Sequence, residues 1–159
     1  MESANKTSLQ NTIVLGIGSP HGDDQVGWRI VEALLAPGML PSHIVVQRAE
    51  PTELLTLFQR LPAVNFIVVD ALSSGDVLGS VHELSIDACI SGVRFYSTHG
   101  VDLASALRLA QQLEIIPRQL RVIGVVGADF SRGAALSPAV LAAVPAVVER
   151  IMIQPKNGD

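Results

Sequence analysis

The stretch TIVLGIGSPHGDD, residues 12–24, joins a short apolar run to a loop of glycines and acidic residues. Its first part, residues 12–16, is rich in β-branched and aliphatic side chains, which favours a buried strand. The following residues, 24–35, repeat apolar side chains at helical spacing. A strand, a polar loop and an amphipathic helix in this order begin a βαβ unit, so the stretch predicts a parallel sheet.

The rest of the chain continues this alternation. We expect further strands at residues 43–47, 65–70 and 119–126, and further helices at residues 52–60, 101–113 and 138–153. Residues 79–84 alternate polar and apolar side chains, which indicates a half-exposed, antiparallel edge strand. Pro145 should bend or interrupt the last helix. The pattern predicts an α/β three-layer sandwich, with a mainly parallel central sheet of about five strands, one antiparallel edge strand and helices on both faces.

Length and composition indicate one domain. The chain has 159 residues, of which 48% are hydrophobic and 16% are charged, and a chain of this size buries a single core. We expect one α/β domain at residues 12–153, a flexible N-terminal tail at residues 1–11 and a C-terminal tail at residues 154–159.

The charge pattern argues against two classes of partner. The net charge is −4, and lysine and arginine form no run, so neither nucleic acid nor an anionic membrane finds clustered cations to bind. The N-terminal stretch is polar, and the apolar run after it is too short for a signal sequence or a membrane span. We therefore expect a cytoplasmic protein, and a monomer.

Cys89 is the only cysteine. A single cysteine forms no intramolecular disulfide and no thiolate metal cluster. Its neighbours Ala88 and Ile90 are apolar, which predicts a packed thiol and not a nucleophile.

Polar residues at the carboxyl ends of the strands are the candidate site residues, because ligands bind there in open parallel sheets. They are Asp24 in the loop after the first strand, Asp70 at the end of the third strand, and His99 in a later loop. The topology should bring them to one edge of the sheet. Two carboxylates and an imidazole suit a divalent transition metal such as nickel or zinc.

Each of these residues also has an ordinary structural explanation. Asp23 or Asp24 could cap the following helix, Asp70 could end a turn, and His99 could be a hydrogen-bonded loop residue. Asp23 and His21, which lie in the same loop as Asp24, are secondary candidates. Convergence at one edge is what favours a site.

A nucleotide site is an alternative, because Gly16, Gly18 and Gly22 lie between a strand and a helix. Their spacing is not that of the dinucleotide-binding loop. Asp23 and Asp24 would also repel a pyrophosphate from the start of the helix. The sequence supports a serine hydrolase even less, since the chain has no G-x-S-x-G motif.

The chain resembles the hydrogenase maturation endopeptidases over residues 11–153. Five segments follow the order and spacing of that family: GIGSPHGDDQVGWRIVEALL, FIVVDAL, STHGVDLASAL, VIGVVGADF and LSPAVLAAVPAVVERI. Ser19 and Gln25 replace the family's common asparagine and glycine, and RAEPTELL, residues 48–55, stands where many members carry D-G-G-T.

The resemblance implies a nickel-dependent endopeptidase of aspartic type. Such enzymes remove a C-terminal extension from the precursor of a nickel-iron hydrogenase large subunit after nickel has been inserted. The residues that match the family's nickel contacts are Asp24, Asp70 and His99, and the nickel is held by the substrate, not permanently by the protease. A non-catalytic checkpoint or chaperone that binds the nickel-loaded precursor is the alternative.

Overall fold

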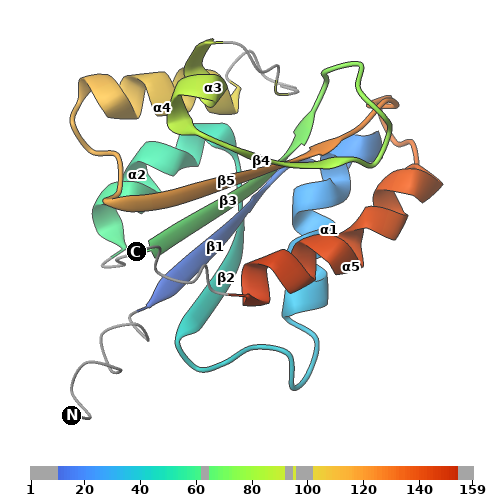
Figure 1. Ribbon diagram of the computed structural model, residues 1–159, viewed down its shortest axis with the longest axis horizontal. Helices are drawn as coiled ribbons and strands as arrows, with labels where there is room; N and C mark the ends of the chain where they lie inside the picture. The colour runs from blue at the N-terminus through green and yellow to red at the C-terminus, as the bar shows by residue number, and fades with distance from the viewer. Residues whose placement is uncertain (1–10, 62–64, 92–94, 96–101, 154–159) are drawn as a thin grey trace.

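Five strands form a single sheet in the computed structural model, which describes residues 11–61, 65–91, 95 and 102–153 (Figure 1). The strand order is β2-β1-β3-β5-β4, and β4 alone pairs antiparallel, with β5. This confirms the predicted mainly parallel sheet with an antiparallel edge strand. The strands are β1 (Thr12–Ile17), β2 (Ile44–Ala49), β3 (Asn65–Leu72), β4 (Val81–Leu84) and β5 (Gln119–Val126).

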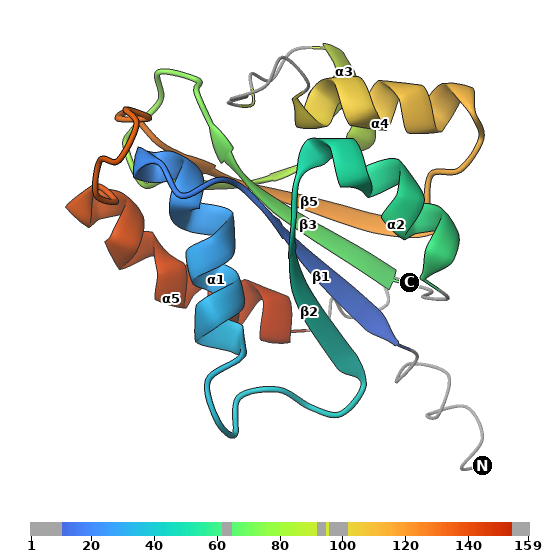
Figure 2. The ribbon, with the colours of Figure 1, turned by 180° about the vertical axis from the view of Figure 1, so that it is seen from behind.

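Helices cover both faces of the sheet, as predicted (Figure 2). One face carries α1 (Val26–Leu34) and α5 (Pro138–Met152), and the other carries α2 (Leu54–Arg60), α3 (Ile86–Ser91) and α4 (Leu103–Gln112). Short 3-10 turns, η2 (Gly22–Gln25) and η3 (Pro51–Glu53), precede α1 and α2. No helix of the described residues is both long and apolar enough to cross a membrane.

The central strands are buried on both sides, which explains their continuous apolar sequence. All six residues of β1 are buried. Ile13 and Leu15 pack on the side of α2 and α4, whereas Val14 packs on the side of α1 and α5. The period of two along a strand thus supplies both halves of the core.

The expected start of the first helix was wrong, and so was a break at Pro145, which was one of the two effects expected there. The helix expected from Asp24 begins at Val26, because η2 occupies the preceding residues. The last helix runs without interruption through Pro145. Pro145 and Leu141, the residue whose carbonyl loses its helical partner, both lie on the exposed face, where water can satisfy that carbonyl.

Two glycines let β1 and α1 pack backbone to backbone. A Cβ atom on Gly27 would lie 2.2 Å from the carbonyl oxygen of Ile17 and 2.9 Å from that of Val69. A Cβ on Gly16 would lie 2.2 Å from the carbonyl oxygen of Gly27. Neither position has room for a side chain, so α1 holds the end of β1 in a fixed place.

Gly27→Ala is therefore expected to lower the free energy of unfolding by about 3 kcal/mol, since the clash with two carbonyl oxygens outweighs the gain in helix propensity. Urea denaturation measures the change. The matched control is Gly38→Ala, because a Cβ there meets no atom within 4 Å and the cost, about 1 kcal/mol, comes from its φ of +80° alone. Equal losses for the two variants would contradict the close approach.

Candidate functional site

The candidate site lies at the carboxyl end of β1, where the neighbouring strands β2 and β3 lie on opposite sides of β1. The segment after β1 crosses through α1 to β2 on one side of β1, while β3 pairs with the other side of β1. The loops that leave the carboxyl ends of β1 and β3 therefore diverge, and α/β proteins bind ligands at such a point. Asp24 follows β1 in η2, and Asp70 lies near the end of β3.

Asp70 is a fully buried carboxyl group. Side chains alternate along a strand, so it faces the same side as Phe66 and Val68, toward α2 and α4. Its Oδ1 accepts a hydrogen bond of 2.8 Å from the backbone N–H of Ala71. Its Oδ2 is buried and has no hydrogen-bond partner among the described residues. A buried acceptor without a partner is costly and points to a missing ligand.

Burial and two neighbouring charges raise the pKa of Asp70 well above its ordinary value. Burial is the largest cause, the negative charge of Asp24 adds to it, and the more weakly acting charge of Asp102 adds further, while the hydrogen bond from Ala71 opposes the shift. The ionised form of Asp70 is thus disfavoured until a cation compensates it.

Asp24 is also buried, with 4% of its surface exposed. Its effect on the pKa of Asp70 means that the two carboxyl groups lie close enough to repel each other when both are ionised. A divalent cation held between them would remove that repulsion. The 3-10 turn η2, which carries Asp24, contacts β3, which carries Asp70, so both carboxyl groups lie at the same edge of the sheet.

His99, the third predicted ligand, lies outside the described residues. Within the described part of the chain, no three histidine, cysteine, aspartate or glutamate side chains are grouped closely enough to hold a metal ion. The imidazole ligand therefore stays a prediction.

Asp102 is an acidic residue at this edge that the sequence-based prediction missed. It caps α4, where its Oδ1 accepts a hydrogen bond of 2.8 Å from the backbone N–H of Ser105. An aspartate immediately before a helical apolar repeat is the sequence signal for this role. Asp102 lies at the start of α4, on the face of the sheet opposite α1, and its negative charge helps to raise the pKa of Asp70.

Asp23 has a structural role that differs from that of Asp24. Its fully buried carboxylate accepts hydrogen bonds from the backbone N–H groups of Ala128 at 2.9 Å, Asp129 at 3.0 Å and Ser137 at 2.7 Å, and from the Ser137 hydroxyl at 2.8 Å. Burial works against ionisation, but these bonds together lower the pKa of Asp23. The carboxylate is occupied in joining two loops.

His21 takes part in the same contact between loops. Its Nδ1 accepts a hydrogen bond of 3.1 Å from the backbone N–H of Gly133. The side-chain amide of Gln25 and the backbone N–H of Gly22 both donate to the carbonyl oxygen of Ala134, each at 3.0 Å. The loop that carries Asp24 is thus fixed to residues 128–137, which precede α5.

Arg48, the first residue of the divergent segment 48–55, packs on Trp28 in α1. The guanidinium of Arg48 lies 5.0 Å from the centre of the Trp28 ring, and its Nη2 lies 2.5 Å from the carboxylate of Glu32. A Cβ on Gly18 would lie 3.3 Å from the Trp28 ring. Trp28 thus packs against Gly18 in the first loop, and Arg48 packs on Trp28.

The surroundings of Cys89 exclude it as a nucleophile. Cys89 is buried, and burial raises the pKa of its thiol to about 11, so it is a packed thiol, as predicted.

A cavity of about 260 Å³ is lined by residues such as Thr12, Asn65 and Gln119, which begin three of the parallel strands. It lies at the opposite end of the sheet from Asp24 and Asp70.

A family model and several solved structures are similar to this chain. A family model described as hydrogenase maturation protease matches residues 29–154. A search of curated proteins found no match. Solved structures with the same fold include the hydrogenase maturating endopeptidase HybD from E. coli, with 24% identity over 90% of both chains and a TM-score of 0.72.

Two further structures are similar. The NiFe hydrogenase maturation protease HybD from Thermococcus kodakarensis is 22% identical over 89% of this chain and 97% of that one, with a TM-score of 0.70. The hydrogenase 3 maturation protease is 21% identical over 90% of both chains, with a TM-score of 0.73. At these identities the likeness establishes the fold.

Proposed function

Because the chain belongs to the hydrogenase maturation protease family, we propose that it removes the C-terminal extension of a nickel-iron hydrogenase large-subunit precursor after nickel has been inserted. Family membership makes the protein a peptidase.

One observation carries the proposal: the buried Oδ2 of Asp70 lacks a hydrogen-bond partner among the described residues and lies under the influence of the Asp24 charge. Two buried carboxyl groups that lie close together are unfavourable when both are ionised. Carboxylate oxygens are suitable ligands for a divalent transition metal, and such a cation would compensate both. These residues therefore fit a nickel ion that the substrate presents.

In this mechanism Asp24 and Asp70 contact the nickel of the precursor, and His99 supplies a nitrogen ligand. The contact fixes the scissile peptide bond at the edge of the sheet. Hydrolysis then adds hydroxide to the carbonyl carbon and a proton to the leaving amine. A metal centre can supply Lewis-acid chemistry for this step, and one of the two carboxylates accepts the proton of the attacking water.

The proposal predicts cleavage that depends on nickel in the substrate. Wild-type protein is incubated with nickel-loaded and with nickel-free precursor, and intact-mass spectrometry measures the length of each. The loaded precursor should lose its C-terminal extension, whereas the nickel-free precursor should keep its mass.

Two outcomes would contradict the proposal. Equal shortening of both precursors would mean that nickel is not recognised. Binding of the loaded precursor without any change in mass would instead favour the non-catalytic checkpoint.

A further inference from the structure

The loop between β3 and β4, residues 73–80, exposes two apolar side chains. Val77 is 79% exposed and Leu78 is 37% exposed, and Val77 is the most exposed large hydrophobic residue of the described part of the chain. Single exposed apolar residues are common on protein surfaces. This pair differs from them because polar contacts hold the loop in shape and because the loop lies near the candidate site.

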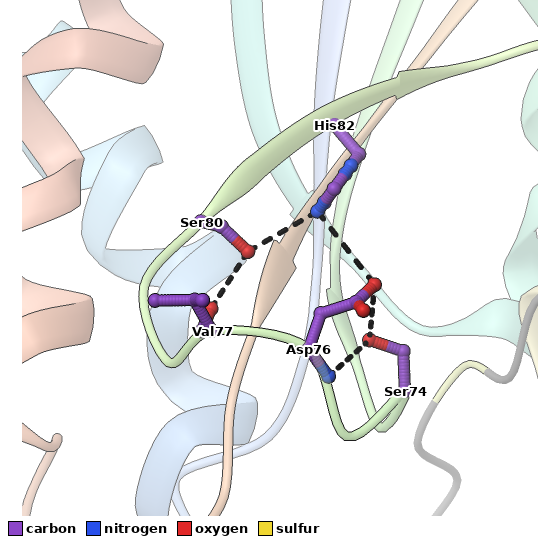
Figure 3. Close-up of polar contacts among 5 residues, drawn as sticks. All are labelled: Ser74, Asp76, Val77, Ser80 and His82. Atoms are coloured by element: carbon purple, nitrogen blue, oxygen red, sulfur yellow. Dashed lines mark hydrogen bonds and ion pairs between the residues drawn. The ribbon is translucent and has the colours of Figure 1, made fainter.

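The loop is held by its own polar contacts (Figure 3). The Ser80 hydroxyl donates to the carbonyl oxygen of Val77 at 2.6 Å and lies 3.1 Å from Nε2 of His82. The backbone N–H of Asp76 donates to the Ser74 hydroxyl at 3.3 Å, and the Asp76 carboxylate lies 4.0 Å from His82 Nε2. The apolar tip is therefore preorganised, which reduces the entropy lost on binding.

These contacts do not form a catalytic triad. Ser80 and Asp76 both approach the same ring nitrogen of His82, Nε2. Activation of a serine needs the carboxylate on one imidazole nitrogen and the hydroxyl on the other. The serine, histidine and aspartate shape the loop and have no nucleophilic role.

The loop lies on the same edge of the sheet as the candidate site. Gly79 donates a hydrogen bond of 2.8 Å to the carbonyl oxygen of Val126, at the end of β5. Gly127, which follows Val126 in the chain, packs on Asp23. A Cβ on Gly127 would lie 2.6 Å from the Cβ of Asp23. Figures 1 and 2 both draw this loop beside the segment that precedes α5.

We propose that Val77 and Leu78 form a docking site for the large-subunit precursor. The inference rests on the proposed function, in which a folded protein must bring its scissile bond to Asp24 and Asp70. A stable protein interface covers about 800 Å² of each partner. An interface of that size centred on the carboxyl end of β3 includes the loop that leaves β3. The precursor is expected to present an apolar surface to Val77.

The test uses nickel-free precursor as the probe. The proposed function predicts that this precursor is not cut, and the docking site predicts that it still binds, so its affinity can be measured without turnover. Biolayer interferometry measures its Kd for wild-type protein and for the double variant Val77→Ser, Leu78→Ser. The loss of apolar burial should raise the Kd about tenfold. Thermal unfolding shows that the variant is folded, and any change in Tm should come mainly from Leu78, which is less exposed than Val77.

The matched control is Leu35→Ser, since Leu35 is 57% exposed but follows the end of α1, at the opposite end of the sheet. Its Kd should equal that of the wild type. An unchanged Kd for the double variant, an equal rise for Leu35→Ser, or no binding of the probe by the wild type would overturn the docking site. Failure of the proposed function is a separate result, read from the mass of nickel-loaded precursor.

Discussion

Asp70→Asn is expected to abolish processing of the precursor and, at neutral pH, to make the protein more stable. The amide keeps the oxygen that accepts from Ala71 but cannot supply a second negatively charged oxygen to a cation. Loss of a direct metal contact should lower the rate of processing by roughly 100-fold or more, since even an indirect partner of a metal ligand contributes about 10- to 100-fold.

The gain in stability follows from the raised pKa of Asp70. The pKa is higher in the folded than in the unfolded protein, so the folded state is favoured most below the unfolded pKa of 3.8 and loses that advantage as pH rises through the folded pKa. The neutral amide avoids this loss. At pH 7 the free energy of unfolding should rise by about 1–3 kcal/mol.

Urea denaturation of wild type and Asp70→Asn at a series of pH values measures this difference. The advantage of the variant should shrink as the pH is lowered toward 4, where the wild-type carboxyl is protonated as well. A variant that is less stable than the wild type at pH 7 would contradict the unfavourable burial of the Asp70 charge. A trade between activity and stability of this kind is common at functional sites.

Asp23→Ala is expected to have the largest effect on folding. It leaves the three backbone N–H groups and the hydroxyl that now donate to Asp23 without their acceptor. Hydrogen bonds to a charged group and the desolvation of orphaned donors each contribute about 1–3 kcal/mol. Because some of the donors will find water, we expect a total loss of about 3–4 kcal/mol.

The pH dependence of this effect has the opposite sign to that of Asp70. The hydrogen bonds lower the pKa of Asp23 below 3.8 despite its burial, so its contribution to stability is present above pH 3.8 and is lost as the pH falls through the folded pKa. The difference between wild type and Asp23→Ala in urea denaturation should therefore narrow below about pH 4.

Asp129→Asn is the control, because Asp129 lies in the same segment but its side chain is exposed and accepts only from Ser131 among the contacts described. It should change stability little. If Asp23→Ala were no more destabilising than Asp129→Asn, the hydrogen bonds of Asp23 would not stabilise the contact between the two loops.

Most of the sheet was predictable from the sequence because each strand is a distinct apolar run. The central strands are buried on both faces and are continuous β-branched segments, whereas the residues of β4, at the end of the sheet, are only partly buried or exposed, so its sequence mixes polar and apolar side chains. The helix α3 was not predicted, since a helix of only six residues, Ile86–Ser91, is too short to show a helical period.

The site could be predicted only in part. Topology explains why Asp24 and Asp70 lie at the same edge of the sheet, since Asp24 follows β1 and Asp70 lies near the end of β3, which pairs parallel with β1. The sequence could not separate the roles of Asp23 and Asp24, because adjacent carboxylates look alike and the partners of Asp23 lie more than 100 residues away. His99 stays a prediction, as it lies outside the described residues.

The most direct test of the nickel-reading site is the mass of nickel-loaded precursor after incubation with wild-type protein and with the variants Asp24→Asn, Asp70→Asn and His99→Ala. Circular dichroism first establishes that each variant is folded. We predict that the wild type alone shortens the precursor by the C-terminal extension. Normal shortening by two of the three variants would contradict the assignment of these side chains to the reaction.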